Sequence, residues 1–327
     1  MDIALCFDKN IGDYAAVLLT SICETNRGEM ICFHIVQDGS LLKKQISIME
    51  KLAHKYEQNI CFYTFDIEQH DLPITDYHAS TFMRIFLPEI ISDKIEKILY
   101  LDIDMIVLGN LRELFSIKME GNAFLVCIDD CEYSTKTFNR IDLPFTEWKG
   151  KSYFNTGMML IDLDCWRKEN LTQNVLLFMR EHQNKKYRLA DQDVLNVIFH
   201  DRAKIISSKY NYLLNLMLDY RNFDIRQEQY SMIQAASTCP RIVHRYGYEH
   251  PWYSDSKNPY TKIWRYFAKL AGINDYHRCF TGKNLLRNTI RNYLAAFGLC
   301  MPFDLQYSEQ SIRSAKQIYQ KIIKKAK

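Results

Sequence analysis

The chain has 327 residues, of which 47% are hydrophobic and 25% are charged. This length and composition can bury a sizeable core, which excludes an intrinsically disordered protein and a small disulfide-stapled scaffold. The net charge of +3 is uneven, because residues 281–327 hold nine Lys or Arg against two acids, a net +7 that leaves −4 for the rest of the chain. A basic tail on an acidic body suggests an anionic partner for the tail.

The first residues do not look like a secretion signal, because Asp2 and Asp8 stand where a signal peptide has a basic flank and an apolar stretch. We therefore expect a cytoplasmic protein that starts at Met1, and no apolar run is long enough to predict a membrane span. Four of the ten cysteines lie in apolar, strand-like runs: Cys6, Cys32, Cys61 and Cys127. Without a CxxC pair for zinc, the sequence favours reduced, buried thiols.

Short apolar runs alternate with segments of helical period in the first half of the chain. The predicted strands are 3–7, 30–36, 60–65, 98–101 and 123–128, with amphipathic helices over 14–22 and 41–56. This alternation predicts an α/β protein with a mostly parallel, doubly wound sheet. Ligands of such sheets bind beyond the carboxyl ends of the strands, so the polar residues that follow strands are the first candidates for a site.

The pattern loosens after residue 150. We expect a turn and strand over 153–162, helices over 165–181 and 194–199, and a short strand over 241–243. Together with the first half, these elements predict one catalytic domain over residues 1–270.

Residues 271–327 are predicted to form a separate tail of two basic amphipathic helices. In the first, apolar residues from Leu285 to Phe297 recur every four positions, and the opposite face carries Lys283, Arg287 and Arg291. Such helices fit peripheral attachment to an anionic membrane face. The alternative is a helical pair packed on the body with its charges in solvent. Nucleic acid is disfavoured, because the aromatic residues do not interleave with the basic ones.

The strongest local signal is an apolar strand that ends in Asp102-Ile103-Asp104. Two carboxylates one residue apart can offer hard oxygen ligands to Mn²⁺ or Mg²⁺. Taken alone, the pair could equally turn the chain after a strand.

Further motifs follow in a fixed order. They are Phe154-Asn155-Thr156-Gly157, Asp191-Gln192-Asp193, and the segment 244–252, His-Arg-Tyr-Gly-Tyr-Glu-His-Pro-Trp. With residues 4–10 and the two acids, their order and spacing resemble glycosyltransferase family 8, in particular the bacterial lipopolysaccharide galactosyl- and glucosyltransferases. The resemblance spans roughly residues 1–270.

The resemblance implies a GT-A fold and transfer of a sugar from a UDP-sugar with retention of configuration. It implies Mn²⁺, with Mg²⁺ as the alternative ion, held by Asp102, Asp104 and His244. The implied donor-binding residues are Cys6, Phe7, Asp8, Asn10, Ile103, Gly247 and His250. The family commonly has Lys where this chain has His250, and a histidine is charged only part of the time near pH 7.

The resemblance also implies the residues around the reacting sugar: Arg84, Asp129, Asn155, Asp191 and Gln192. Departure of UDP builds negative charge on the diphosphate and positive charge on the ring, so a cation and carboxylate or amide oxygens suit these places. An amide is a poor nucleophile, so we favour same-face attack by the acceptor over a covalent intermediate on Gln192.

Each of these residues has an ordinary structural role as its alternative. Asp8, Asn10 and Asn155 are common in turns, Asp191 could cap a helix, and Arg84 could form a surface ion pair. Trp252 is expected to pack rather than to bind a sugar.

The sequence thus predicts a hexosyltransferase, using UDP-galactose or UDP-glucose, at the inner face of the cell membrane. The expected acceptor is a lipid-linked bacterial saccharide, lipopolysaccharide or lipooligosaccharide. Capsular, teichoic or glycoprotein acceptors are the alternatives within the same chemistry. A catalytically inactive sugar-nucleotide-binding protein is the alternative from another class, and intact Asp102, Asp104, His244 and Gln192 argue against it.

Overall fold

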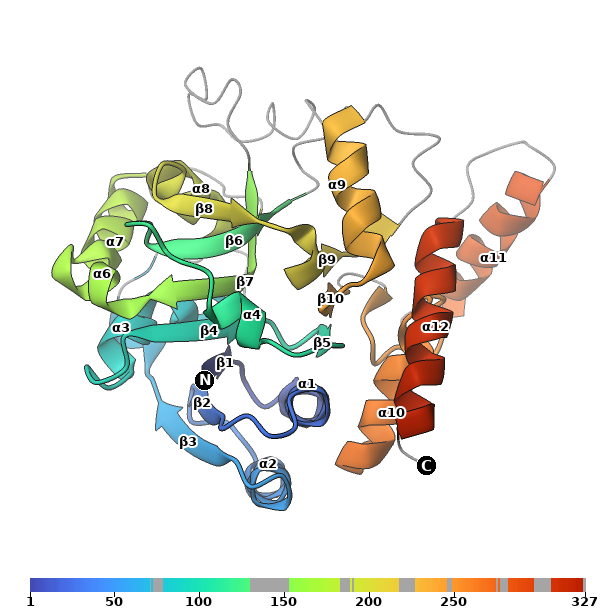
Figure 1. Ribbon diagram of the computed structural model, residues 1–327, viewed down its shortest axis with the longest axis horizontal. Helices are drawn as coiled ribbons and strands as arrows, with labels where there is room; N and C mark the ends of the chain where they lie inside the picture. Colours follow the sequence, from blue (N-terminus) through green and yellow to red (C-terminus); the bar gives the residue numbers. More distant parts are fainter. Residues whose placement is uncertain are drawn as a thin grey trace.

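The computed structural model describes residues 1–70, 72, 79–129, 153–182, 189, 191–217, 227–245, 249–274, 276, 282–296 and 307–325 (Figure 1). Its main sheet has seven strands in the order β3-β2-β1-β4-β7-β6-β8. These strands are β1 (Asp2–Cys6), β2 (Cys32–Gln37), β3 (Asn59–Thr64), β4 (Lys97–Leu101), β6 (Phe124–Ile128), β7 (Phe154–Asp162) and β8 (Ala203–Ile206). A second sheet joins β5 (Met105–Val107), β10 (Ile242–His244) and β9 (Tyr212–Leu213) in that order.

Helices surround the main sheet. The α-helices are α1 (Gly12–Thr25), α2 (Lys43–Lys55), α3 (Leu87–Ile90), α4 (Arg112–Phe115), α6 (Leu163–Lys168), α7 (Leu171–Glu181), α8 (Asp191–Phe199), α9 (Gln227–Thr238), α10 (Thr261–Ala271), α11 (Gly282–Ala296) and α12 (Glu309–Lys325). Short 3-10 helices are η1 (Ile67–His70), η2 (Ala79–Phe86), η5 (Ser208–Tyr210) and η6 (Asn215–Met217).

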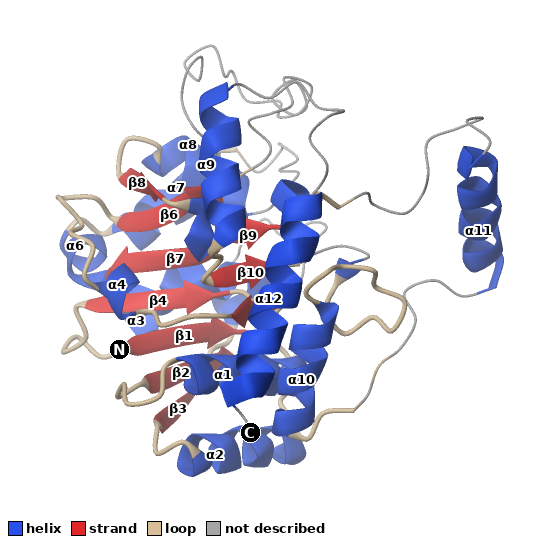
Figure 2. Ribbon diagram, turned by 45° about the vertical axis from the view of Figure 1, so that its right-hand side comes forward, coloured by secondary structure: helices blue, strands red, loops and turns tan. Residues whose placement is uncertain are grey.

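One strand of the main sheet runs against its neighbours. The pairs β1–β2, β2–β3, β1–β4 and β6–β8 are parallel, whereas β7 pairs antiparallel with β4 and β6 (Figure 2). The first residues of β7 therefore lie at the same edge of the sheet as the last residues of β4 and β6. That edge collects the candidate residues that follow the strands.

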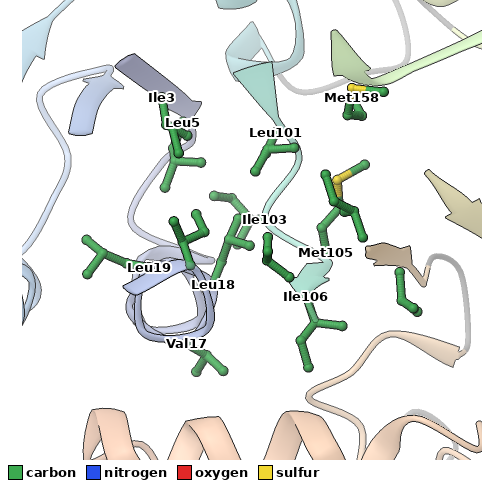
Figure 3. Close-up of a cluster of buried hydrophobic side chains, with 14 of the residues drawn as sticks. Ile3, Leu5, Val17, Leu18, Leu19, Leu101, Ile103, Met105, Ile106 and Met158 are labelled. Carbon is green, nitrogen blue, oxygen red and sulfur yellow. The ribbon is translucent and has the colours of Figure 1, made fainter. Parts of the chain in front are cut away.

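Alternating residues of the strands build two cores, one on each face of the sheet. Ile3 and Leu5 of β1 pack with Leu18 of α1 and with Ile103 and Met105 (Figure 3). The other face, represented by Ala4, packs with residues of η2, α3, α6, α7 and α8. Helix α1 is buried along most of its length, because α10 covers its outer side.

The predicted strands of the first half are confirmed to within about two residues, but one predicted helix is wrong. Residues 165–181 do not form one helix, because Asn170 adopts a left-handed backbone (φ 53°) and separates α6 from α7. The prediction of buried thiols is also only partly correct. All seven cysteines in the described part of the chain are free, and Cys6 and Cys127 are buried, but Cys32 is half-buried and Cys61 is exposed.

The two tail helices differ in what they contact. Helix α12 packs on the body, where Ala315 is buried and the Tyr212 hydroxyl shares a 2.7 Å hydrogen bond with Ser311. Helix α11 stands away from the body (Figure 2), and Leu286, Ile290 and Tyr293 are more than half exposed. Within the described chain, no helix has the length and apolar character that a bilayer span requires.

Candidate active site

Three potential metal ligands meet where the two sheets join. Asp102 and Asp104 lie in the turn between β4 and β5, and β10 pairs with β5 so that His244 lies opposite Met105. His244 Nε2 is 3.1 Å from Asp104 Oδ1 and 3.9 Å from Asp102 Oδ2. One ligand atom from each of the three residues lies within 4.8 Å of the other two. Strand pairing thus brings together the acids and a histidine that are about 140 positions apart.

The surroundings of this cluster fit a divalent cation. Asp104 Oδ1 is buried and accepts no hydrogen bond from the described residues, although it lies close to His244. Burial alone would raise the pKa of Asp104, but attraction to His244 and His250 outweighs burial and lowers this pKa well below its ordinary value. Gly157 leaves the room that the ligands occupy, because a Cβ there would lie 2.5 Å from His244 Cε1 and 2.7 Å from Asp102 Oδ2. Two carboxylates and one imidazole suit Mn²⁺ or Mg²⁺.

A chain of hydrogen bonds orients the His244 ring. The Asp129 carboxylate accepts from Asn155 Nδ2 (2.9 Å), so Asn155 turns its Oδ1 toward Asn211 and accepts from Asn211 Nδ2 (2.8 Å). Asn211 therefore presents its own Oδ1 to His244 Nδ1, at 3.1 Å. Because that oxygen can only accept, Nδ1 carries a proton and Nε2 is the ring nitrogen that faces the two acids.

Arg84 connects the acid pair to the next motif. Its guanidinium lies 3.3 Å from Asp102 Oδ1 and 3.1 Å from Asp191 Oδ2, and Nη1 donates to the Thr156 carbonyl (2.8 Å). The same group lies over the Tyr100 ring, with Cζ 4.6 Å from the centroid. Arg84 is only 6% exposed, so it is not a surface ion-pair partner. Burial opposes its charge, but Asp102 and Asp191 raise the pKa of Arg84, and it stays charged.

Asp191 and Gln192 begin α8 and face β7. Burial raises the pKa of Asp191 to about 6, although the attraction of Arg84 partly opposes this. Gln192 Oε1 accepts from Asn155 Nδ2 (3.0 Å) and from the Thr156 amide (3.1 Å), while Gln192 Nε2 donates to Asp129 Oδ2 (3.0 Å). Asp129, Asn155, Asp191 and Gln192 are all buried. The structure therefore joins all five predicted sugar-side residues to the predicted metal ligands in one network.

A family model described as glycosyl transferase family 8 matches residues 2–256. The chain belongs to glycosyltransferase family 8. Among its relatives, a lipopolysaccharide 1,2-glucosyltransferase of Escherichia coli is 32% identical over 249 residues, covering 75% of this chain and 71% of the relative. A lipopolysaccharide 1,3-galactosyltransferase of Salmonella typhimurium is 26% identical over 281 residues, covering 85% and 80%. The resemblance identified from the sequence is thus confirmed.

A solved structure extends the comparison to the fold. The galactosyltransferase LgtC, in a complex with donor and acceptor sugar analogs, aligns with a TM-score of 0.70 at 22% identity, covering 88% of this chain and 99% of LgtC. This family 8 chain therefore has the GT-A fold that the sequence predicted.

Four of the residues expected to bind the nucleotide lie at the end of β1, a fifth, Ile103, lies between β4 and β5, and they differ in exposure. Cys6 and Phe7 are buried, and Ile103 lies in the core beside α1 (Figure 3). Asp8 and Asn10 are more exposed and form a turn, in which Asp8 Oδ1 accepts from the Asn10 amide (2.8 Å).

His250 lies beside Asp104 of the candidate metal cluster in this family 8 enzyme. Its Nδ1 lies 3.4 Å from Asp104 Oδ2, and its ring stacks on Trp252 at 4.4 Å. Trp252 in turn stacks on Tyr14 of α1 at 4.4 Å and is buried, so its predicted packing role is confirmed. Gly247, the other predicted residue of this segment, lies outside the described residues.

The sequence interpretation missed several residues of the network. Asn211 orients His244, and the Tyr100 hydroxyl donates to Asp102 Oδ1 (2.6 Å). Asn196 holds the start of β7 by a reciprocal pair of 2.8 Å hydrogen bonds with the backbone of Phe154. The only sequence signal for these two residues is their position: Tyr100 lies on the strand that leads to Asp102, and Asn196 lies on the helix that begins with Asp191 and Gln192. Asn211 had no comparable signal, because it lies outside every motif.

Proposed function

We propose that this family 8 glycosyltransferase moves galactose or glucose from a UDP-sugar to a bacterial surface saccharide, with retention of configuration. The observation that carries the proposal is that Arg84 touches both an acid of the metal cluster and the Asp191-Gln192 pair. A leaving diphosphate bound at the metal cluster and a reacting sugar bound at Asp191 and Gln192 would then be neighbours. The names of the lipopolysaccharide-modifying relatives support a lipopolysaccharide or lipooligosaccharide acceptor.

In this proposal Asp102, Asp104 and His244 hold Mn²⁺, or Mg²⁺ in its place. The bound cation supplies positive charge for the leaving diphosphate. Arg84 adds a second, permanent positive charge beside Asp102. We assign to His250 a hydrogen bond to a phosphate oxygen, because its ring lies beside Asp104. Cys6, Phe7, Asp8, Asn10, Ile103 and Gly247 complete the proposed nucleotide-binding set.

The sugar would lie against the amide and carboxylate network. Asp129 and Asn155 offer polar atoms for sugar hydroxyls, and the Asp191 carboxylate can stabilise positive charge on the ring. The bond between sugar C1 and the phosphate oxygen breaks, and the acceptor oxygen bonds to C1 on the same face. The acceptor proton passes to the departing phosphate oxygen, so no enzyme residue has to take it.

The contacts of Gln192 argue against a covalent intermediate on this residue. Its Oε1 already accepts hydrogen bonds from Asn155 and from the Thr156 amide. Donated hydrogen bonds withdraw electron density from an amide oxygen that is already a weak nucleophile. We therefore assign to Gln192 the role of positioning Asn155 and Asp129 and of presenting its dipole to the ring.

The decisive test measures UDP release from a panel of sugar nucleotides, with Mn²⁺ or with EDTA. We expect metal-dependent hydrolysis of one UDP-hexose, which Asp104→Ala abolishes. Asp164→Ala is the matched control, because Asp164 is a half-exposed acid on α6, remote from the cluster. If the chain binds a sugar nucleotide without releasing UDP even after saccharide acceptors are added, it is an inactive binding protein. If no sugar nucleotide binds, the proposed function fails.

We further propose that α11 attaches the enzyme peripherally to the anionic inner face of the cell membrane. Its exposed apolar residues Leu286, Ile290 and Tyr293 could enter the interface while its Lys and Arg residues meet anionic headgroups. Helix α12 is already packed on the body, so the proposal rests on α11 alone. An acceptor carried on lipid would then be presented in the plane of the enzyme.

Vesicle binding tests this attachment. We expect the chain to sediment with vesicles that contain anionic lipid and not with zwitterionic vesicles. The double substitution Leu286→Ser and Ile290→Ser should abolish sedimentation, and the control Leu177→Ser, at an exposed leucine of α7, should leave it unchanged. Equal binding of the wild type and the double variant would contradict the proposal.

A further inference from the structure

A second group of potential metal ligands lies at the opposite end of the strands from the active site. It comes from three neighbouring parallel strands: Asp2 begins β1, Cys32 and His34 lie on β2, and Cys61 lies on β3. The register places Asp2 opposite Cys32, and His34 opposite Cys61. Because side chains alternate along a strand, residues paired in this way project from the same face of the sheet.

Three side chains of this group, those of Asp2, Cys32 and His34, are close enough to share one metal ion. His34 Nε2 lies 3.0 Å from Asp2 Oδ1, and one ligand atom each of Asp2, Cys32 and His34 lies within 4.8 Å of the other two. Cys61 joins these three through the strand register, which places it opposite His34 on the neighbouring strand. The other ring nitrogen, His34 Nδ1, lies 3.0 Å from the Tyr63 hydroxyl.

The burial of the group resembles that of a small binding site. His34 is only 2% exposed, Asp2 and Cys32 are half-buried, and Cys61 is exposed. Further along the same face, Ala4 packs in the apolar core. The fixed histidine therefore forms the inner wall, and a solute can approach from the side of Cys61.

Hydrogen bonding within the sheet explains only part of this arrangement. The contacts of His34 to Asp2 and Tyr63 account for the imidazole and the carboxylate. They do not account for two thiols beside them, since a thiol is a weak hydrogen-bond donor and acceptor.

We propose that Asp2, Cys32, His34 and Cys61 form a binding site for a divalent cation of the zinc class. Two sulfurs, one imidazole nitrogen and one carboxylate oxygen are a donor set that Zn²⁺ takes in tetrahedral sites. On binding, each thiol releases its proton to solvent, and the Tyr63 hydroxyl accepts from His34 Nδ1–H, which leaves Nε2 as the ligand. The absence of a CxxC pair concealed this site in the sequence, because the two cysteines lie on different strands.

Such a site would join β1, β2 and β3 at the edge where the chain begins. A ligand that binds only the folded state raises the free energy of unfolding. This gain grows with the logarithm of the ratio of the ligand concentration to the dissociation constant. The site needs no part of the active-site network, so it is independent of the proposed transferase function.

Cobalt(II) is the most direct probe, because sulfur ligands give Co²⁺ an intense near-ultraviolet charge-transfer band. The active-site cluster of Asp102, Asp104 and His244 has no sulfur and cannot produce this band. We expect the untagged full chain to develop the band with one equivalent of Co²⁺ and to lose it when Zn²⁺ is added. The variant Asp104→Ala should keep the band, which separates this result from any failure of the transferase proposal.

Substitutions identify the ligands. Cys32→Ser and Cys61→Ser should each remove most of the band and weaken zinc binding by about 100-fold or more, since loss of a residue that only hydrogen-bonds to a metal ligand already costs about 10–100-fold. Cys239→Ser is the matched control, at an exposed cysteine after α9, and should leave the band unchanged. If the wild type gives no band, or if both single variants retain it, the proposal is wrong.

Alkylation gives a second measurement that does not depend on a variant folding. Zn²⁺ should protect Cys61 of the wild type from N-ethylmaleimide by at least about tenfold in rate, whereas exposed Cys239 reacts equally with and without the metal. Equal modification of Cys61 in both conditions would overturn the proposal.

Discussion

Asn211 Oδ1 and His244 Nδ1 are 3.1 Å apart, and this contact decides which ring nitrogen faces Asp102 and Asp104. The Asn211 amide is itself fixed, because its Nδ2 donates to Asn155 Oδ1 (2.8 Å). The orientation of a proposed metal ligand thus depends on a residue that is itself neither a proposed metal ligand nor a proposed sugar ligand.

Asn211→Ala should therefore weaken Mn²⁺ binding. Without the acceptor, the His244 ring can rotate or protonate at the wrong nitrogen, and partners of this kind cost about 10–100-fold in metal affinity. A Mn²⁺ titration followed by electron paramagnetic resonance measures this directly. Asn174→Ala, on the exposed face of α7, is the control and should bind Mn²⁺ as the wild type does. Unchanged affinity in the Asn211 variant would show that the contact does not orient the ligand.

Gly157→Ala should abolish metal binding while the chain still folds. The new methyl group would lie 2.5 Å from His244 Cε1 and 2.7 Å from Asp102 Oδ2, which is far inside contact distance. We expect the clash to displace these two side chains rather than the backbone, because the backbone of Gly157 is held in β7. The same Mn²⁺ titration reports the loss, and circular dichroism checks the fold. Wild-type affinity would mean that the ligands tolerate the shift.

Arg84→Ala should destabilise the fold and stop turnover together. Its removal leaves the Asp102 and Asp191 carboxylates without their shared cation, and breaking a buried ion pair typically costs about 3–5 kcal/mol. Urea unfolding and UDP release measure the two effects. Arg112→Ala, which removes an exposed ion pair with Glu29, should change neither. Wild-type unfolding of the Arg84 variant would mean that water readily replaces the guanidinium.

The folding stability should carry a pH dependence that comes from Asp191. Its pKa is raised from the ordinary 3.8 to about 6 in the folded protein, so the folded state holds this proton more tightly than the unfolded state. The contribution of Asp191 is fully present below pH 3.8 and is lost as the pH rises through 6. At about 1.4 kcal/mol per pH unit, the change approaches about 3 kcal/mol.

Urea unfolding between pH 4 and 7, with EDTA present, tests this linkage. Wild-type stability should fall relative to Asp191→Asn as the pH rises, because Asn cannot ionise. Parallel stability curves for the two proteins would contradict the assigned cause. Asp164→Asn serves as the control at a half-exposed acid.

The residues that hydrophobic patterning alone could select are those that follow buried strands, whereas Arg84, Asp191 and Gln192 were selected only through the resemblance to family 8. Asp102 and Asp104 follow the apolar strand 98–101, and the rule that sites lie beyond strand ends was sufficient to select them. The break between α6 and α7 could not be predicted, because the left-handed turn at Asn170 interrupts a pattern whose apolar residues keep a helical period. The hydrophobic periodicity of a sequence contains no signal for a left-handed turn at a residue other than glycine.

Asn211 and the pair of Cys32 with Cys61 show a different limit. Their roles arise from strand register and from side-chain contacts between distant segments. No spacing along the chain encodes the meeting of Asn211 with His244, and Cys32 and Cys61 are brought together only because β2 and β3 pair in parallel. The sequence also could not show that α12 packs on the body while α11 stands away from it, because both helices have an apolar face and a basic face.

Helix α12 has a consequence for how the protein can be shortened. Ser311 on this helix shares a hydrogen bond with Tyr212 of β9, and β9 pairs with β10, which carries His244. The C-terminal helix therefore braces the strand that presents a proposed metal ligand, although about 70 residues separate the two in the chain. A truncation after α10, made to remove the exposed apolar residues of α11, would also remove α12 and its hydrogen bond to Tyr212. An internal deletion confined to α11, closed by a flexible linker, would remove the proposed membrane contact and leave the hydrogen bond between Ser311 and Tyr212 in place.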